Sequence, residues 1–302
     1  MQPFWPRRSP HFLACRRAVR PFTGPAVIGL SGGADSLALA AAAAAEGKDA
    51  RVVAVDHGLQ EGSAVIAERA AAQARAWGLE AEVVRVRVRA GNLEAAAREA
   101  RYEALRSFGR DVWVAHTAED QAETLLLGAL RGNPSGMAPS EGGIVRPFLG
   151  VRRADTEGAC AELGVEPWHD PMNRDPSFRR VHLRTEIIPQ LSELIGGDAV
   201  PALAKTADRI AEERALVASI SELSATDDCA ELAREPAPIR RRRLVAWLIE
   251  QGVEVQGDQL EAIDALVTRW RGQGGVAVGG GRSVRRAANL LVVVPGAGEV
   301  AR

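Results

Sequence analysis

The sequence predicts an α/β protein, a parallel twisted sheet with helices on both faces, followed by a smaller, mainly helical domain. Short Val- and Ile-rich runs alternate with Ala-rich segments of helical length in the first half, a pattern typical of βαβ units. With 302 residues, the chain exceeds the ~250–300 residues at which single cores stop growing. After Pro189 the pattern becomes mainly helical, which places a domain boundary near 190–200.

The expected elements follow from these patterns in chain order. The strands are expected at 26–30, 51–55, 81–88 and 111–115. The helices are expected at 36–46, 63–77, 92–107, 119–131, 151–163, 190–195, 200–224, 237–251 and 257–271, with a closing hairpin at 276–294. The stretch 166–180 contains too many prolines for regular structure and is expected to form an ordered loop. The domains are therefore expected at 1–25 (a basic arm or helix), 26–195 (catalytic) and 196–302 (helical).

Composition excludes several classes of protein. The chain is 46% hydrophobic and 25% charged, which is typical of soluble globular proteins, and no apolar run approaches the ~20 residues of a membrane span. Its three cysteines lie far apart without a CxxC pair, so no zinc ribbon, iron–sulfur site or disulfide framework is expected. We therefore expect a reducing, cytoplasmic location. The acid-free segment 1–34 carries five arginines, and an organellar transit peptide is the weaker alternative to a basic helix.

The stretch LSGGADS at 30–36 joins the first strand to the first helix of the sheet. A turn alone needs only a glycine or two, whereas this loop adds two hydroxyls and a carboxylate at a helix start. Bare backbone N–H groups and the positive end of the helix suit an oxyanion such as phosphate. A lysine does not follow the glycines, so the loop is not a Walker A motif.

Other polar residues follow the later strands. His116 is expected at the end of the fourth strand, with Asp120 and Glu123 on one face of the next helix. Such a trio could accept protons, bind a metal or orient a substrate, and a structural role is the less favoured alternative. Asp56 and His57 end the second strand, where a structural turn is nearly as plausible as an adenosine contact. Arg98 lies on a helix with Arg101 and Tyr102, and a solvated helix face is an equal alternative.

SGGADS resembles the SGGxDS loop of the PP-loop ATP pyrophosphatases, which cleave ATP to AMP and pyrophosphate. The segments DHGLQ, AREARYEAL, HTAEDQAET, RGNPSGM, VRPFL and HDPMNRDPSFRRVHLR then resemble, in order and spacing, the tRNA(Ile)-lysidine synthetases. This resemblance implies that the wobble cytidine of a CAU-anticodon tRNA(Ile) is adenylated by ATP and then coupled to free L-lysine. It covers residues 26–190 strongly.

The resemblance also implies site residues. The implied catalytic residues are Asp35, His116, Asp120, Glu123 and Arg180. The implied ATP-binding residues are Ser31, Gly32, Gly33, Ala34, Asp35, Ser36, Asp56, His57 and Arg98, and Mg²⁺ is expected on Asp35 and Asp120. The chain departs from the family pattern where Thr117 stands for a His, Glu119 for an Asp, Met172 for a Ser and Val181 for an Asn. The longer Glu119 puts the metal geometry there in doubt.

The partners expected are the tRNA and lysine, with no membrane and no obligatory protein partner; a homodimer is compatible with the sequence. The net charge is −1, so tRNA must be bound by local arginine patches. RRRR at 240–243 is one candidate, although at most two of its four side chains can face one partner. The alternative function is another PP-loop synthetase that acts through an adenylated intermediate.

Overall fold

The computed structural model describes residues 5–6, 8–58, 62–86, 93–170, 175, 177–220, 224–253, 255 and 257–296. They form two compact units, Met1–Leu127 with Pro134–Ala211 and Gly128–Asn133 with Glu212–Arg302. The division falls later than the expected 195/196 boundary, because helix α9 (Ala199–Ile220) continues without a break from one unit into the other. The last residues of the expected third strand, 87–88, and most of the 170–176 stretch lie outside the described residues.

The first unit is built on a six-stranded sheet in the order β3-β2-β1-β4-β6-β5. Its strands are β1 (Ala26–Leu30), β2 (Ala50–Asp56), β3 (Glu80–Arg85), β4 (Asp111–Trp113), β5 (Ser140–Glu141) and β6 (Ile144–Val145). All neighbours pair in parallel except β5, which is antiparallel to β6. The four predicted strands form the parallel part in which each is joined to the next by a helix, as in βαβ units.

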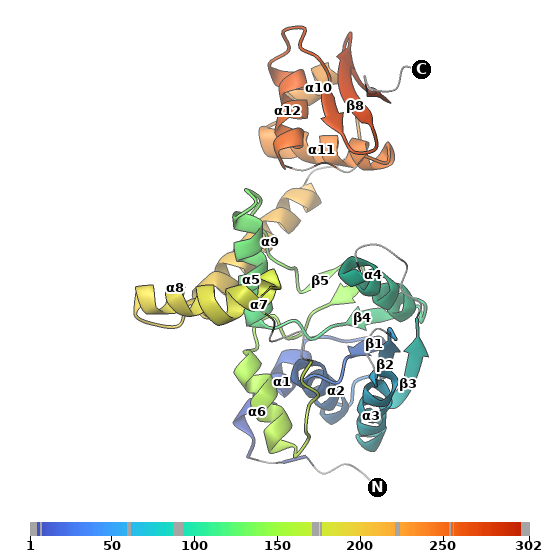
Figure 1. Cartoon of the computed structure of the whole chain (residues 1–302), viewed down its shortest axis with the longest axis vertical. Coiled ribbons are helices and arrows are strands. Elements are labelled where there is room, and N and C mark those ends of the chain that lie inside the picture. Colours follow the sequence, from blue (N-terminus) through green and yellow to red (C-terminus); the bar gives the residue numbers. More distant parts are fainter. Residues whose placement is uncertain are drawn as a thin grey trace. The chain divides into compact units, whose positions relative to one another are not determined.

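Helices cover both faces of this sheet, which confirms the predicted fold class (Figure 1). The helices are α1 (Pro10–Val19), α2 (Ala34–Ala45), α3 (Ser63–Ala76), α4 (Leu93–Arg106), α5 (Ala118–Ala129), α6 (Arg153–Glu162), α7 (Arg179–His182) and α8 (Ile188–Ile195). A π-helical turn, Leu183–Ile187, joins α7 to α8.

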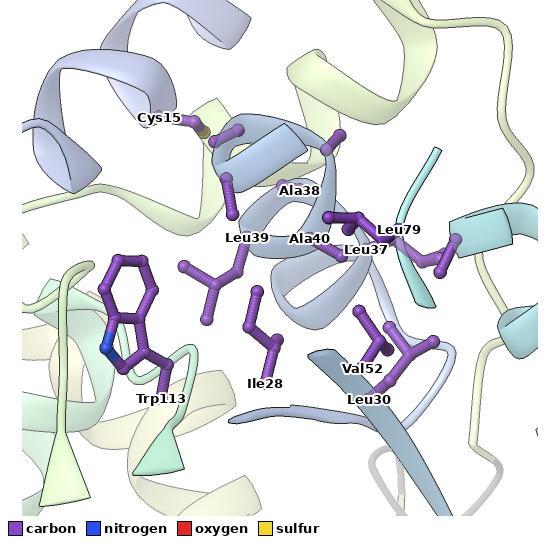
Figure 2. Packing of buried hydrophobic residues seen from close by; sticks show 14 of the residues in the cluster. Cys15, Ile28, Leu30, Leu37, Ala38, Leu39, Ala40, Val52, Leu79 and Trp113 are labelled. Atoms are coloured by element: carbon purple, nitrogen blue, oxygen red, sulfur yellow. The ribbon is translucent and has the colours of Figure 1, made fainter. Parts of the chain in front are cut away.

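Successive side chains of β1 point to opposite faces of the sheet, and each face packs against its own layer of helices. Ile28 packs into a cluster with Leu39 of α2, whereas its neighbour Val27 packs with Leu105 of α4. Strands buried on both faces are apolar without alternation, as the AVIGL run of β1 is. Figure 2 shows the first cluster, in which the small side chains of α2 allow that helix to lie close to the sheet.

The basic N-terminal segment contains a helix, α1, that packs on α2 and α6. Arg16 and Arg20 both pair with Glu46, and His11 lies 2.9 Å from Asp155. Of the two expectations for this segment, an arm or a helix, residues 10–19 therefore form the helix. Among the described residues, no helix is long and apolar enough to cross a membrane.

In the described part of the second unit, three further helices follow the end of α9 and pack with a small antiparallel sheet. They are α10 (Cys229–Arg234), α11 (Ala237–Glu250), α12 (Gly257–Thr268), β7 (Val276–Val278), β8 (Arg282–Ala287) and β9 (Leu290–Pro295). The predicted closing hairpin is in fact a three-stranded meander, β7-β8-β9. Its second turn places Ala288, at φ +54°, where a glycine would normally signal a turn.

Candidate active site

The loop between β1 and α2 is organised by its own serines. Gly32 has φ +83°, a backbone conformation that residues with a side chain rarely adopt. Its carbonyl accepts a hydrogen bond from the Trp168 backbone N–H (2.9 Å). The Ser36 hydroxyl donates to the Gly33 carbonyl (3.0 Å) and lies 3.1 Å from the Ser31 hydroxyl. Ser36 is buried and shapes the loop, whereas Ser31 is exposed. The first N–H groups of α2 have no partner within the helix and can bind an oxyanion.

A cavity of about 320 Å³ lies beside this loop. Its lining includes Gly32, Ile66 and Gln73, and the loop residues Glu166 and Trp168. The proline-rich loop that follows α6 therefore borders the phosphate loop directly, which gives the ordered loop expected from the sequence a position at the site.

Arg153, the first residue of α6, lies among three carboxylates. Its Nε is 3.7 Å from Asp35, its Nη2 is 3.2 Å from Asp120, and its Nη1 is 3.9 Å from Glu123. The hydroxyl of Thr156, one turn along α6, donates to the Asp35 carboxylate. The structure thus brings together three residues that the sequence placed on two separate helices, and adds two partners that the sequence did not indicate.

Thr117 fixes the orientation of Asp120. The Thr117 backbone N–H (2.8 Å) and hydroxyl (3.0 Å) both donate to Oδ2 of Asp120, a capping interaction at the start of α5. The other oxygen, Oδ1, faces Arg153. Thr117 is fully buried.

Two arginines on the following helical segment contact Glu123. Arg184 donates to Glu123 at 2.8 Å, and Arg180 lies 3.4 Å from it. The Glu123 side chain is fully buried, whereas the Arg180 side chain is 48% exposed, so part of it is accessible to a ligand. Arg184 was not predicted, although it follows Arg180 by four residues, a spacing that places both on one helix face. It lies in the π-helical turn, a feature that is frequent at functional sites.

Burial and the arginines set the charges of this cluster. Burial raises the pKa of Asp35 and of Glu123. Burial also opposes ionisation of Asp120, but Arg153 and the Thr117 N–H outweigh it and the pKa of Asp120 is lowered. Burial, aided by nearby arginines, lowers the pKa of His116 to about 4, so its imidazole is neutral at pH 7.

The contacts of Asp56 favour a structural turn after β2 over a contact with adenosine. Asp56 is 3% exposed, and its Oδ1 accepts hydrogen bonds from the Ser63 hydroxyl (2.6 Å) and the Gly58 N–H (2.9 Å). Asp56 therefore shapes the turn after β2. His57 follows it in that turn and is half-buried.

Glu119 connects α5 to the start of α6. One of its oxygens accepts from the Arg152 side chain and the other from the Arg153 N–H, both at 2.8 Å. Both oxygens are thus engaged at the N-terminus of α6. The Glu119 side chain thereby links α5 to α6.

Comparisons with known proteins agree with this geometry. Residues 17–191 match the family model of the PP-loop domain, and residues 228–292 match that of the TilS substrate binding domain. A U34-tRNA thiolase from Methanococcus maripaludis shares the fold, with a TM-score of 0.54 at 15% identity over 72% of this chain and 82% of that one.

Closer relatives are tRNA(Ile)-lysidine synthases. The chain is 52% identical over 294 residues to the one from Corynebacterium diphtheriae, covering 97% of this chain and 100% of the relative. It is 51% identical over 284 residues to that of Corynebacterium glutamicum, covering 91% and 90%. The chain belongs to the tRNA(Ile)-lysidine synthase family.

Proposed function

We propose that this protein joins free L-lysine to C2 of the wobble cytidine of CAU-anticodon tRNA(Ile), converting ATP to AMP and pyrophosphate. The observation that carries this proposal is the convergence of Asp35, Asp120 and Glu123 beside the phosphate loop, in a chain of the tRNA(Ile)-lysidine synthase family. The site offers an anion-binding loop, charged groups for an ammonium ion and proton acceptors within one cluster.

In the first step, the cytosine C2 oxygen attacks the α-phosphorus of ATP and pyrophosphate leaves. The loop residues Ser31 to Ser36 are proposed to hold the departing pyrophosphate through backbone N–H groups and the exposed Ser31 hydroxyl. Arg180, with its half-exposed planar guanidinium, is proposed to stabilise the negative charge that builds on the α-phosphate.

Magnesium is proposed to arrive with the nucleotide. Among the described residues, no three His, Cys, Asp or Glu side chains are arranged to hold a metal, as expected where the triphosphate supplies most ligands. Asp35 fits as a protein ligand because a hard carboxylate lies at the phosphate loop. Asp120 is engaged by Thr117 and Arg153, so Asp120 can act as a ligand only if Arg153 moves. The ion would neutralise charge on the pyrophosphate.

In the second step, the ε-amine of lysine attacks C2, the new C–N bond forms, and AMP leaves with the former C2 oxygen. Asp120, whose pKa is lowered, stays ionised and is proposed to orient the lysine ammonium. The neutral His116 and the buried Glu123, whose pKa is raised, are the proposed acceptors for the proton that the amine must lose.

The second unit is proposed to contact the tRNA, since the family model that matches residues 228–292 is named for substrate binding. We propose a cytoplasmic location because tRNA and free lysine are the expected partners. The reaction requires no other protein, and a homodimer is compatible with it.

The test is incorporation of labelled lysine into an unmodified CAU-anticodon tRNA(Ile) transcript with ATP and Mg²⁺, with pyrophosphate release followed in parallel. The proposal expects one lysine per tRNA, and no incorporation when the wobble cytidine is changed to uridine. Pyrophosphate release without lysine transfer would instead indicate another PP-loop synthetase with a different nucleophile.

A further inference from the structure

A group of arginines gathers around Tyr102, on the sheet face that α4 covers. The guanidinium carbons of Arg98 and Arg101 lie 5.1 and 5.4 Å from the centre of the Tyr102 ring. Tyr102 is buried in the apolar cluster of this face, and Arg98 is exposed at its edge. Arg146, which follows β6 and is 9% exposed, completes the group and donates to the Ala138 carbonyl (2.8 Å).

In the ranges that the structure describes, Arg98, Arg101 and Arg146 form no direct ion pair with a carboxylate, although the charge of Glu141 acts on Arg146. Among the described residues, the Nε atoms of Arg101 and Arg146 are buried without a hydrogen-bond partner, and so is Nδ1 of His57 and of His116. Burial, reinforced by the charge of Arg98, lowers the pKa of both Arg101 and Arg146. Buried donors and charges of this kind are costly unless a partner satisfies them. A bound anion would satisfy these unpartnered donors, which no carboxylate contacts within the described part of the chain.

This basic group adjoins the reaction site through His116. The pKa of His116 responds to Asp120 on one side and to Arg98, Arg146 and Arg101 on the other. A nucleotide whose base reached the carboxylate cluster past His116 would bring its sugar-phosphate toward these arginines.

We infer that Arg101 and Arg146, with Arg98 at the edge, form a subsite for a backbone phosphodiester flanking the wobble cytidine. This inference rests on the proposed function. A phosphodiester is a bare anion with oxygens for several N–H donors, which matches a group of cations that no carboxylate contacts directly. A lysine carboxylate fits less well, because its adjacent α-ammonium would meet the same positive charges. ATP already has the phosphate loop, so the subsite replaces the ATP contact expected for Arg98.

The experiment measures the KM values for tRNA, lysine and ATP, and tRNA binding in a filter assay without ATP, for wild type, Arg101→Gln, Arg101→Lys and Arg146→Gln. Arg106→Gln is the matched control, because Arg106 also lies over Tyr102 (5.7 Å) but is exposed and does not affect His116. Thermal melting checks that each variant folds. Two further substrates are semi-synthetic tRNAs, each with a single uncharged methylphosphonate, placed on the 5′ side of the wobble cytidine in one and on the 3′ side in the other.

The expected result for Arg101→Gln and Arg146→Gln is a roughly tenfold loss of kcat/KM for tRNA and weaker binding, with lysine and ATP KM values within about twofold. Arg101→Lys should recover part of the loss. In the wild type, one of the two methylphosphonates should lower kcat/KM for tRNA by a similar factor. In Arg101→Gln, the same methylphosphonate should lower kcat/KM by less than about twofold further, because the contact is already lost. Fully additive losses, or a rise confined to the lysine or ATP KM, would overturn the inference. Failure of wild type to incorporate lysine would instead count against the proposed function.

Discussion

Replacing Arg153 with methionine removes a positive charge that contacts Asp35, Asp120 and Glu123 together. At the 3.2 Å separation from Asp120, the Coulomb attraction is about 5 kcal/mol for an effective dielectric constant of ~20. Breaking a buried ion pair costs about 3–5 kcal/mol, because a charge is left unpaired. Arg184 still pairs with Glu123, so we expect the lower end, a loss of about 3 kcal/mol in the free energy of unfolding at pH 7.5.

The loss should depend on pH with a defined sign. Without the guanidinium, the pKa values of the three carboxyl groups rise in the folded state, so the folded protein binds more protons than before. Unfolding then becomes easier as the pH rises through the raised pKa values. Relative to wild type, the variant should lose about 3 kcal/mol at pH 7.5 but only about 1 kcal/mol near pH 5, where protonation relieves the repulsion.

Urea unfolding followed by tryptophan fluorescence at both pH values measures this difference. The control is Arg152→Met, because the neighbouring Arg152 pairs with Glu119 and Asp198 at a more exposed position. Its loss should be about 1 kcal/mol at both pH values. An equal deficit at both pH values for Arg153→Met would refute the idea that this guanidinium holds the carboxylates ionised.

Three further predictions concern single residues. His116→Asn should flatten the rise of stability between pH 4 and 6.5 by about 3 kcal/mol, because the folded protein keeps His116 neutral where the unfolded chain protonates it; an unchanged slope in pH-dependent unfolding contradicts this. Gly136→Ala should cost about 3 kcal/mol in thermal unfolding, since its Cβ would lie 1.9 Å from the Ala207 carbonyl oxygen; a wild-type melting temperature contradicts this. Asp120→Asn should lower lysine incorporation by about 10³-fold without unfolding the protein, and near-normal incorporation contradicts its role.

The sheet could be predicted because each strand carries its own local signal. β1 was predicted at its observed bounds, since a Gly-rich loop ends it and a charged segment precedes β2. The second unit was harder. α10 has only six residues, too few to show a repeating apolar pattern of helical spacing. The turn at Ala288 has no glycine to separate β8 from β9. The RRRR segment behaves as its helical spacing requires, because Arg240 and Arg243 are buried and pair with acids.

Site residues could be predicted from the sequence only where polar or charged side chains directly follow the predicted strands. Asp35 and Asp120 follow adjacent parallel strands, and the carboxyl ends of such strands share one edge of the sheet. Arg153 and Thr156 lie on α6 and reach the site through the packing of α6 against α2, which no local pattern of residues encodes. Their roles therefore became visible only in the structure.

Two of the four departures from the family pattern, Thr117 and Glu119, both support Asp120. Thr117 uses both its N–H and its hydroxyl to hold one Asp120 oxygen, which a larger imidazole at this position would do with different geometry. Glu119, one methylene longer than aspartate, reaches the start of α6 and so fixes the backbone of Arg153, which holds the other Asp120 oxygen. Because both departures converge on one carboxylate, exchanging either singly, Thr117→His or Glu119→Asp, should disturb Asp120 before it disturbs the phosphate loop.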